Sequence, residues 1–347
     1  MRIASVGRAL PGPRHSQEDL LAGLRDLWSK HIRNPKRLDQ IHRNVLVGGR
    51  HLALPMEDYR ELHGFRAAND AFIRCAVPLG EAAVRDALAR AGLEPRDVNH
   101  IFCASVTGLA TPSIDARLVN RLGLRSDVKR TPIFGLGCVA GAAGIARASD
   151  VLRASPSDVA VLLCVELCSL TLQREDFSVP NLIASGLFGD GAAAVVLTGG
   201  DLPHAGPEIL ATRSVFYPDT EDAMGWEIGD TGFRVVLSAE VPRIARGIRK
   251  DVDEFLASQG FDLEDVTHYV CHPGGPRVLE AFEEALELPK EALALSWRSL
   301  REIGNLSSAS VLMVLGDTLA CEPPPGSLGL LMAMGPGFCA ELVLLRW

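Results

Sequence analysis

Gly92-Leu-Glu-Pro-Arg-Asp-Val-Asn-His-Ile-Phe-Cys103 is a stretch that the chain repeats, as Gly260-Phe-Asp-Leu-Glu-Asp-Val-Thr-His-Tyr-Val-Cys271, 168 residues later. Gly, Asp, Val, His and Cys recur at the same places, and both copies join a predicted helix, over 80–92 and 241–260, to a short apolar strand. We therefore expect two similar halves, 1–203 and 204–347, divided within Thr198–Pro207, where Gly, Pro and Asp cluster. The alternative is two unrelated α/β units that happen to share this helix-to-strand pattern.

Short continuous runs of Val, Leu, Ile and Ala predict strands that are buried on both faces. Examples are Val159–Cys164, Ala192–Leu197 and Leu328–Ala333. Such strands need helices to cover them on either side, so we expect a layered α/β fold.

The composition is that of an ordinary globular protein. The chain has 347 residues, of which 47% are hydrophobic and 22% charged, and its formal net charge is −8. An acidic balance argues against nonspecific nucleic-acid binding, because neutralising phosphates requires clustered cations.

One segment, Ser327–Leu345, is nearly all apolar and long enough to suggest a membrane helix. It carries Gly335-Pro336-Gly337 in its middle and Glu341 soon after, so two buried strands joined by a tight turn are the better interpretation. The first sixteen residues lack the apolar core of a signal peptide. We expect a cytoplasmic protein with no membrane span.

Eight cysteines are present, and none forms a CxxC pair, so neither a metal site nor a disulfide framework is expected. Cys138 lies in a distinct setting, Phe134-Gly-Leu-Gly-Cys-Val-Ala-Gly-Ala-Ala-Gly144, where it begins a predicted helix of small residues. The positive end of a helix dipole favours a thiolate, which predicts a lowered pKa and a nucleophile. The alternative is a buried cysteine in a tightly packed helix.

His272 follows the second copy of the repeat, in Cys271-His-Pro-Gly-Gly-Pro-Arg277. This places it at the carboxyl end of a strand, where ligands bind in open α/β sheets. A turn histidine that makes one backbone hydrogen bond is the alternative.

Asn305 lies in Ile303-Gly-Asn-Leu-Ser-Ser-Ala-Ser310, and its amide offers two donors. Alone it would suit a helix N-cap. Cys138 shifted by the repeat distance falls at position 306, so the two halves are expected to bring Asn305 and Cys138 together.

These motifs resemble the type III polyketide synthases, the chalcone-synthase-like condensing enzymes. Four stretches match in the family's order, from about Gly64 to the end: 135–141, 272–276, 304–310 and 335–337. The resemblance implies a thiolase fold, with two similar halves in αβαβα layers, and a homodimer. A β-ketoacyl carrier-protein synthase III shares the Cys, His and Asn set but usually lacks His-Pro-Gly-Gly-Pro.

The resemblance also implies the reaction. Cys138 takes an acyl group from CoA, His272 stabilises the thiolate as an ion pair, and malonyl-CoA loses carbon dioxide. His272 and Asn305 donate to the enolate oxygen that results. The substrates are acyl-CoA and malonyl-CoA, and no metal or redox cofactor is required.

Phe188 looks like the family's gatekeeper aromatic, although it can equally be a core residue under the Gly-Asp-Gly turn. Val235 stands where plant enzymes carry a second gatekeeper aromatic, so we expect a wider entrance. Trp226 replaces a small residue of the plant enzymes. Other positions that match the family's cavity wall are Thr107, Thr111, Glu166, Cys168, Thr171 and Ser307.

The segments 165–173 and 224–226 resemble the bacterial branch that takes long fatty acyl starters and makes alkylpyrones or alkylresorcinols. In that branch a tunnel for the acyl tail runs past the positions of Thr107, Thr111 and Cys168. Small side chains there are consistent with a tunnel and equally with close packing.

The candidate cations for binding the phosphates of CoA lie in a basic stretch that contains Lys36, Arg37, Arg43 and Arg50. Arg277 is a further candidate, together with Gly274 and Gly275 of the preceding turn. The alternative for the basic stretch is a solvated charged face.

Three other functions are alternatives for this sequence. A single-round condensing enzyme would join two acyl thioesters on the same fold. A non-catalytic partner subunit with a degenerate site is disfavoured by the intact Cys138, His272 and Asn305. A papain-like cysteine hydrolase also uses Cys, His and Asn, but its motif around the cysteine differs from this one.

Overall fold

The computed structural model describes residues 1–29 and 35–347, and its main feature is a nine-stranded arrangement in the order β11-β12-β13-β8-β1-β7-β6-β4-β5. The N-terminal half contributes β1 (Arg2–Ala9), β4 (His100–Ala104), β5 (Lys129–Ile133), β6 (Val159–Leu167) and β7 (Asp190–Thr198). The C-terminal half contributes β8 (Glu208–Phe216), β11 (Val266–Cys271), β12 (Leu328–Gly335) and β13 (Cys339–Arg346). The two sets meet at β1 and β8, through the pair Arg2 and Glu208.

The two halves repeat one strand order. Spatially, β1-β7-β6-β4 in the first half corresponds to β8-β13-β12-β11 in the second. In the first half, β7 and β6 are antiparallel and β6 and β4 are parallel. In the second half, β13 and β12 are antiparallel and β12 and β11 are parallel. The repeated sequence leads into equivalent strands, β4 and β11, which confirms two similar halves. The predicted division at 203/204 lies in the loop between β7 and β8.

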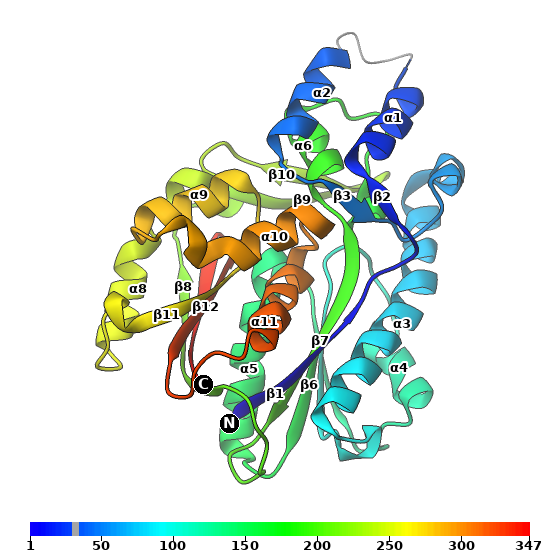
Figure 1. Ribbon diagram of the computed structural model, residues 1–347. Coiled ribbons are helices and arrows are strands. Elements are labelled where there is room, and N and C mark those ends of the chain that lie inside the picture. The colour runs from blue at the N-terminus through cyan, green and yellow to red at the C-terminus, as the bar shows by residue number, and fades with distance from the viewer. Residues whose placement is uncertain (30–34) are drawn as a thin grey trace.

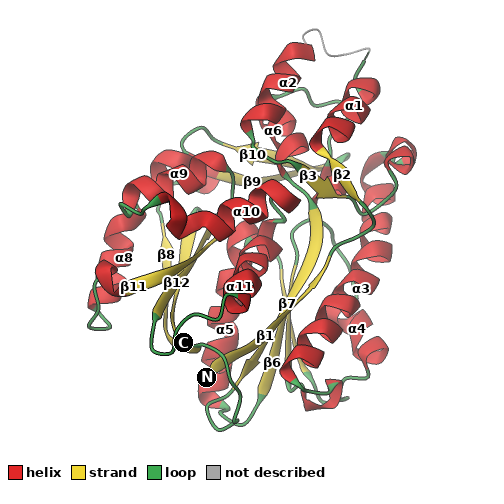
Figure 2. Ribbon diagram, in the orientation of Figure 1, coloured by secondary structure: helices red, strands yellow, loops and turns green. Residues whose placement is uncertain are grey.

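Helices form three layers around these strands (Figures 1 and 2). The central layer is α5 (Ala140–Ala154) and α11 (Ser310–Ala320), whose buried residues share one core with strands of both halves. On the outside, α3 (Gly64–Ala91) and α4 (Ile114–Leu122) cover the first half. The second half is covered by α8 (Ile248–Ala257), α9 (Pro276–Ala285) and α10 (Ala294–Ile303). This αβαβα arrangement is the thiolase fold that we expected.

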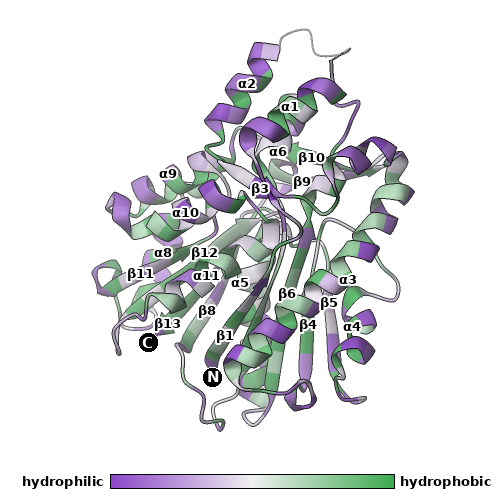
Figure 3. Cartoon of the chain, turned by 45° about the vertical axis from the view of Figure 1, so that its right-hand side comes forward, coloured by the Kyte–Doolittle hydropathy of each residue, from purple (hydrophilic) through white to green (hydrophobic). Residues whose placement is uncertain are grey.

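The strands are apolar because both of their faces are covered (Figure 3). Every residue of β6, β7 and β12 is buried. The three apolar runs singled out in the sequence fall inside these strands, which confirms those predictions.

The central helices pack closely because α5 begins with small residues. A Cβ on Gly141 would lie 2.4 Å from the carbonyl oxygen of Ser308, and one on Gly144 would lie 2.5 Å from Leu162 Cδ1. Neither position could therefore carry a larger side chain without moving its neighbour. Gly141 thus allows the two halves to meet at the centre of the molecule, and Gly144 allows α5 to pack closely on β6.

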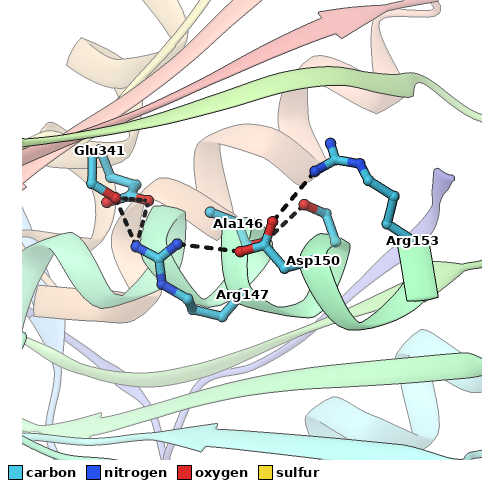
Figure 4. A network of polar contacts seen from close by, with 7 residues as sticks. Ala146, Arg147, Asp150, Arg153 and Glu341 are labelled. Atoms are coloured by element: carbon cyan, nitrogen blue, oxygen red, sulfur yellow. Dashed lines mark hydrogen bonds and ion pairs between the residues drawn. The ribbon is translucent and has the colours of Figure 1, made fainter. Parts of the chain in front are cut away.

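A polar network on α5 also ties the two halves together (Figure 4). Arg147 donates to Glu341 of β13 at 3.2 Å and to Ser214 of β8 at 2.7 Å, and Ser214 donates to Glu341 at 2.9 Å. Arg147 also pairs with Asp150, which pairs in turn with Arg153. Glu341 is thus buried but has partners, as a carboxylate inside a protein requires.

The apolar segment 327–345 forms two paired strands rather than a helix. β12 and β13 are antiparallel and in continuous register from Leu328 and Arg346 to Gly335 and Cys339. Within the described part of the chain, no helix is long and apolar enough to cross a membrane. The single helix expected over 241–260 is wrong, because Gly247 separates α7 (Val241–Ala245) from α8.

The remaining elements gather at one end of the molecule (Figure 1). They are the helices α1 (Gln17–Leu27), α2 (Pro35–Asn44) and α6 (Val179–Leu187), the short helix η1 (Met56–Glu61), and two strand pairs, β2 (Arg14–Ser16) with β3 (Gly49–His51) and β9 (Met224–Gly229) with β10 (Gly232–Leu237). The amino-terminal ends of α5 and α11 point toward this end, which locates the candidate site.

Candidate active site

Cys138 lies in a short helical turn, η3 (Gly137–Val139), that leads directly into α5. Gly137 has a φ of +53°, and a Cβ there would lie 2.7 Å from Pro336 Cδ. A Cβ on Gly335 would lie 2.7 Å from the carbonyl oxygen of Leu136. The Gly-Pro-Gly motif therefore packs against the turn that presents the cysteine, and both contacts require glycine.

The second half carries an equivalent turn, η8 (Ser307–Ala309), which leads into α11. Ser307 takes the place of Gly137 and has a φ of +47°. Ser308 is therefore the counterpart of Cys138, whereas the repeat distance predicts position 306. The difference arises because the segment between the repeat and this turn is two residues longer in the second half. Ser307 Oγ lies 3.6 Å from Cys138 Sγ.

Asn305 is held on both its backbone and its side chain. Its backbone pairs with the segment around Phe188, since its N–H donates to the carbonyl of Leu187 and its carbonyl accepts from Gly189 N, both at 2.9 Å. Its Oδ1 accepts from Ser307 N at 2.8 Å, and its Nδ2 donates to the carbonyl of Gly274 at 3.1 Å. The amide is thus oriented, with one donor on the Gly274 carbonyl and its side chain in hydrogen-bond contact with Cys138.

His272 directly follows β11, and its N–H donates to the carbonyl of Met332 at 2.9 Å. Its side chain is 3% exposed, and neither ring nitrogen has a hydrogen-bond partner in the described part of the chain. Burial lowers the pKa of His272 to about 3, so the ring is neutral. Buried polar atoms without partners are rare, and at a reactive centre they mark groups that bind a substrate.

The pKa of Cys138 differs from the expectation. Burial raises it to about 11, although the hydrogen bonds that Cys138 shares with Ser307 and Asn305 act in the opposite direction, and the charge of Glu166 adds to the rise. The predicted lowering by the helix terminus is therefore wrong for this state, because desolvation of the thiolate outweighs it. Within residues 1–29 and 35–347, no hydrogen bond or ion pair joins Cys138 to His272.

The three predicted catalytic residues are connected by one direct contact and one indirect contact. The Asn305 side chain forms a hydrogen bond with the Cys138 thiol. His272 joins through Gly274, whose carbonyl accepts from Asn305 and whose Cβ position lies 3.4 Å from His272 Cδ2. A methyl group at Gly274 would make ordinary van der Waals contact with the imidazole.

Glu166 and Thr107, both predicted wall residues, belong to a buried carboxylate site beside the cysteine. Glu166 Oε2 accepts from Thr107 Oγ1 at 2.8 Å, from Val106 N at 3.1 Å and from Ser105 Oγ at 3.2 Å. Its Oε1 accepts from Ser308 Oγ at 2.5 Å. Burial raises the pKa of Glu166. Sequence reasoning did not identify Ser105 and Ser308.

A cavity of about 260 Å³ is lined in part by Phe188, the residue expected to be the gatekeeper. Six predicted residues line it: Phe188, Cys168, Thr171, Trp226, Val235 and Arg50. Thr107 does not, because Glu166 and the backbone N–H of Leu167 occupy its hydroxyl. Thr111 does not either, because it is exposed in the segment before α4. Of the three positions expected along a tunnel, Cys168 alone lines this cavity, and the tunnel past Thr107 and Thr111 stays a prediction.

The cavity extends to a helix that sequence reasoning left out. Leu20, Leu24 and Leu27 of α1 form part of its wall, at positions one helical turn or nearly two turns apart. Helical spacing of leucines was the available signal. A polar corner completes the wall, where the Tyr59 hydroxyl lies 2.5 Å from Ser169 Oγ.

The candidate CoA cations divide into two groups. Lys36, Arg37 and Arg43 of α2 are exposed, and so is Arg277 at the start of α9. Arg50 is only 4% exposed and donates to the carbonyl of Phe188 at 2.7 Å. Assignment of Arg50 to a CoA phosphate is therefore wrong, because its guanidinium lies inside the protein. Gly274 and Gly275 lie in the turn between His272 and α9, and Gly275 is buried.

Comparison with known proteins agrees with this fold and site. Residues 2–201 match the N-terminal domain of the chalcone and stilbene synthases, and residues 208–347 match their C-terminal domain. The chain therefore belongs to this family and is a type III polyketide synthase of the bacterial kind, an acyltransferase-type condensing enzyme.

Individual members of the family are similar to this chain over nearly its whole length. The chain is 52% identical to a 1,3,6,8-tetrahydroxynaphthalene synthase of Streptomyces peucetius subsp. caesius, over 99% of this chain and 93% of that protein. It is 33% identical to a phloroglucinol synthase of Pseudomonas fluorescens, over 96% of both. The crystal structure of the Streptomyces coelicolor tetrahydroxynaphthalene synthase superposes with a TM-score of 0.95 at 33% identity, covering 100% of this chain and 99% of that one.

Proposed function

We propose that this enzyme builds a small polyhydroxylated aromatic product, of the tetrahydroxynaphthalene type, by repeated condensation of malonyl-CoA. The observation that carries the proposal is the 52% identity, over nearly the whole chain, to a tetrahydroxynaphthalene synthase. A naphthalene skeleton with oxygen at alternating positions corresponds to five two-carbon units, so malonyl-CoA alone could supply every carbon. This product replaces an alkylpyrone or alkylresorcinol as the first candidate.

Loading begins at Cys138. With a Cys138 pKa near 11 and a His272 pKa near 3, both groups are neutral at pH 7, so the thiol must lose its proton as it attacks the thioester. The neutral imidazole can accept that proton. The Cys138 sulfur then bonds to the acyl carbon, and CoA leaves as the thiol after taking up a proton.

Chain extension depends on hydrogen-bond donors that stabilise the enolate of malonyl-CoA. A second malonyl-CoA loses carbon dioxide, and negative charge develops on its thioester oxygen. The ring N–H of neutral His272 and the side-chain amide of Asn305 would stabilise that oxygen as an oxyanion hole. The enolate carbon then attacks the acyl carbon on Cys138, a carbon–carbon bond forms, and the Cys138 thiolate leaves. The lengthened chain on CoA can be loaded again. No metal or redox cofactor enters these steps.

A fatty acyl starter, leading to an alkylpyrone or alkylresorcinol, is the second candidate. The observation that favours it is the apolar wall of the cavity, which includes Leu20, Leu24 and Leu27 of α1 together with Cys168 and Trp226. An acyl tail would suit such a wall, because each buried methylene stabilises binding by roughly 0.8 kcal/mol.

Mass spectrometry of the products separates these candidates. The enzyme is incubated with malonyl-CoA alone, and separately with malonyl-CoA and a panel of acyl-CoA starters from two to sixteen carbons. An aromatic ten-carbon product from malonyl-CoA alone supports the first proposal. Products that appear only with long starters support the second. A single condensation from labelled malonyl-CoA would instead indicate a one-round enzyme.

We also propose that the enzyme is a homodimer, as the family resemblance implies. Strand β5 is a sheet edge whose residues are mostly exposed, and Leu109 and Phe134 beside it are 39% and 49% exposed. An exposed edge with apolar neighbours suits pairing with a second copy. Analytical ultracentrifugation of the wild type and of Phe134→Asp tests this, since the charge should weaken the dimer.

For CoA, we propose Arg43 and Arg277 as phosphate contacts. Both are exposed, and Arg277 lies one residue into α9, directly after the His272 turn. Their replacement by Gln should raise the KM for malonyl-CoA and leave kcat nearly unchanged, because the contact is the same in ground and transition states.

A further inference from the structure

Arg50 is a buried cation with an unusual environment. It lies on β3, its side chain is 4% exposed, and burial lowers its pKa to about 10. The charge of Asp190 partly offsets this effect, but no carboxylate in the described part of the chain forms an ion pair with Arg50. Its Nε is buried and has no acceptor among the described residues. A buried charge is costly without close partners, so its position calls for a specific role.

Its contacts lie between the two segments that form the catalytic centre. Nη1 donates to the carbonyl of Phe188 at 2.7 Å. The stem of the side chain fills the space beside two glycines: a Cβ on Gly304 would lie 3.1 Å from Arg50 Cγ and Cδ, and one on Gly189 would lie 3.5 Å from Arg50 Cβ. Arg50 therefore packs against the residue after Phe188 and the residue before Asn305.

Those two segments are bonded to each other. Phe188 and Asn305 form a parallel bridge through two backbone hydrogen bonds of 2.9 Å, from Asn305 N to Leu187 O and from Gly189 N to Asn305 O. The Phe188 carbonyl points away from this pair to Arg50. A displacement of that carbonyl would move the bridge and, with it, the Asn305 amide.

We propose that Arg50 is a positioning residue that fixes Asn305 for decarboxylation by clamping the carbonyl of Phe188. This inference rests on the proposed function of Asn305 as an oxyanion donor. A charge-assisted hydrogen bond is shorter and stronger than a neutral one, and a guanidinium holds its direction better than a flexible amine. Since oxyanion donors act only when they are well placed, a shift on the order of 1 Å can cost about a hundredfold in rate.

The same strand pair supplies a matched control. Arg14 lies on β2, whose residue His15 pairs with Arg50. Arg14 also donates to a backbone carbonyl, that of Glu302, at 2.7 Å, but it is exposed and lies outside the cavity wall. Arg14→Met therefore removes the same type of bond from the same strand pair without touching Phe188.

The experiment compares the wild type with Arg50→Met, Arg50→Lys and Arg14→Met in three measurements. These are covalent labelling of Cys138 by a radioactive acyl-CoA, release of carbon dioxide from malonyl-CoA, and Tm. We expect Arg50→Met to lose on the order of a hundredfold in carbon dioxide release while labelling stays within about twofold. Arg50→Lys should fall between Arg50→Met and the wild type, and Arg14→Met should match the wild type.

Each other outcome is decisive. Wild-type carbon dioxide release by Arg50→Met would overturn the positioning role, and so would equal loss of labelling and release. If Arg50→Met does not fold, Arg50→Lys decides the question by the same ratio of release to labelling. If the wild type itself neither labels nor releases carbon dioxide, the proposed function fails, which is a different result from failure of the Arg50 inference.

Discussion

Trp226 lies directly opposite Val235 across the β9–β10 pair, and both side chains line the cavity. The family resemblance implies that Val235 stands where plant members carry a gatekeeper aromatic and that Trp226 stands where they carry a small residue. On that reading, the large side chain lies on the facing strand in this protein. Phe233, two residues before Val235 on the same face, supports the indole with ring centroids 6.0 Å apart. The wider entrance expected from Val235 alone is therefore offset by Trp226.

Trp226→Gly should enlarge the cavity and shift the products toward longer polyketides, because it removes the largest side chain of this wall. Mass spectrometry of products from malonyl-CoA measures the shift. The cost in stability should be small, since a cross-strand pair contributes about 0.2–1 kcal/mol.

Ile228→Gly is the control for this variant, because Ile228 lies on the same strand, is 56% exposed and does not line the cavity. An unchanged product distribution in Trp226→Gly would mean that the indole does not limit chain length.

Cys168→Phe should depress kcat/KM for long acyl-CoA starters and spare short ones, because the larger ring would fill part of the cavity that Cys168 lines. Loss of room for three methylenes corresponds to roughly 2.4 kcal/mol, or on the order of fiftyfold. Competition between hexanoyl-CoA and a sixteen-carbon acyl-CoA measures the ratio.

Thr111→Phe, by contrast, should change neither value, since Thr111 is exposed and outside the cavity wall. If Cys168→Phe treats both starters alike, no acyl tail occupies this cavity.

Alkylation of Cys138 by iodoacetamide should accelerate about tenfold per pH unit between pH 7 and 9, because a raised pKa leaves little thiolate at pH 7 and the thiolate is the nucleophile. The raised pKa of about 11 predicts no plateau in this range. Peptide mass mapping restricts the measurement to Cys138.

Ser307→Ala should slow this alkylation at every pH, since the Ser307 hydrogen bond lowers the pKa of the thiol. A rate that is already constant above about pH 7 would indicate a thiolate–imidazolium pair in the free enzyme, as the sequence motifs predict.

Asn305→Ala should retain acyl loading on Cys138 but lose roughly a hundredfold or more of malonyl-CoA decarboxylation, because one oxyanion donor is removed. Radiolabel trapping and carbon dioxide release measure the two steps separately. Cys138→Ala is the reference for absent loading. Equal loss of both steps in Asn305→Ala would point to a purely structural role for the amide, through its bonds to Ser307 and Gly274.

The sequence by itself determined the architecture and predicted Cys138, His272 and Asn305 as the catalytic set. The repeated stretch at Gly92 and Gly260 fixes two equivalent strands, and continuous apolar runs mark strands that are covered on both faces. Glycines around Cys138 report close contacts that only glycine permits, and Gly275 after His272 has a φ of +151°, which favours glycine. These signals are local, since each depends on neighbours in the chain, and so a single sequence can carry them.

Tertiary structure alone decided which side chains share a space. Thr107 and Cys168 both looked like wall residues, yet the Thr107 hydroxyl bonds to Glu166 while Cys168 faces the cavity. Arg50 looked like a surface cation, but the packing of β3 against Phe188 and Gly304 buries it. The Cys138 pKa rises because desolvation depends on everything packed around the thiol, and burial of this kind is a property of the assembled fold rather than of any stretch of sequence.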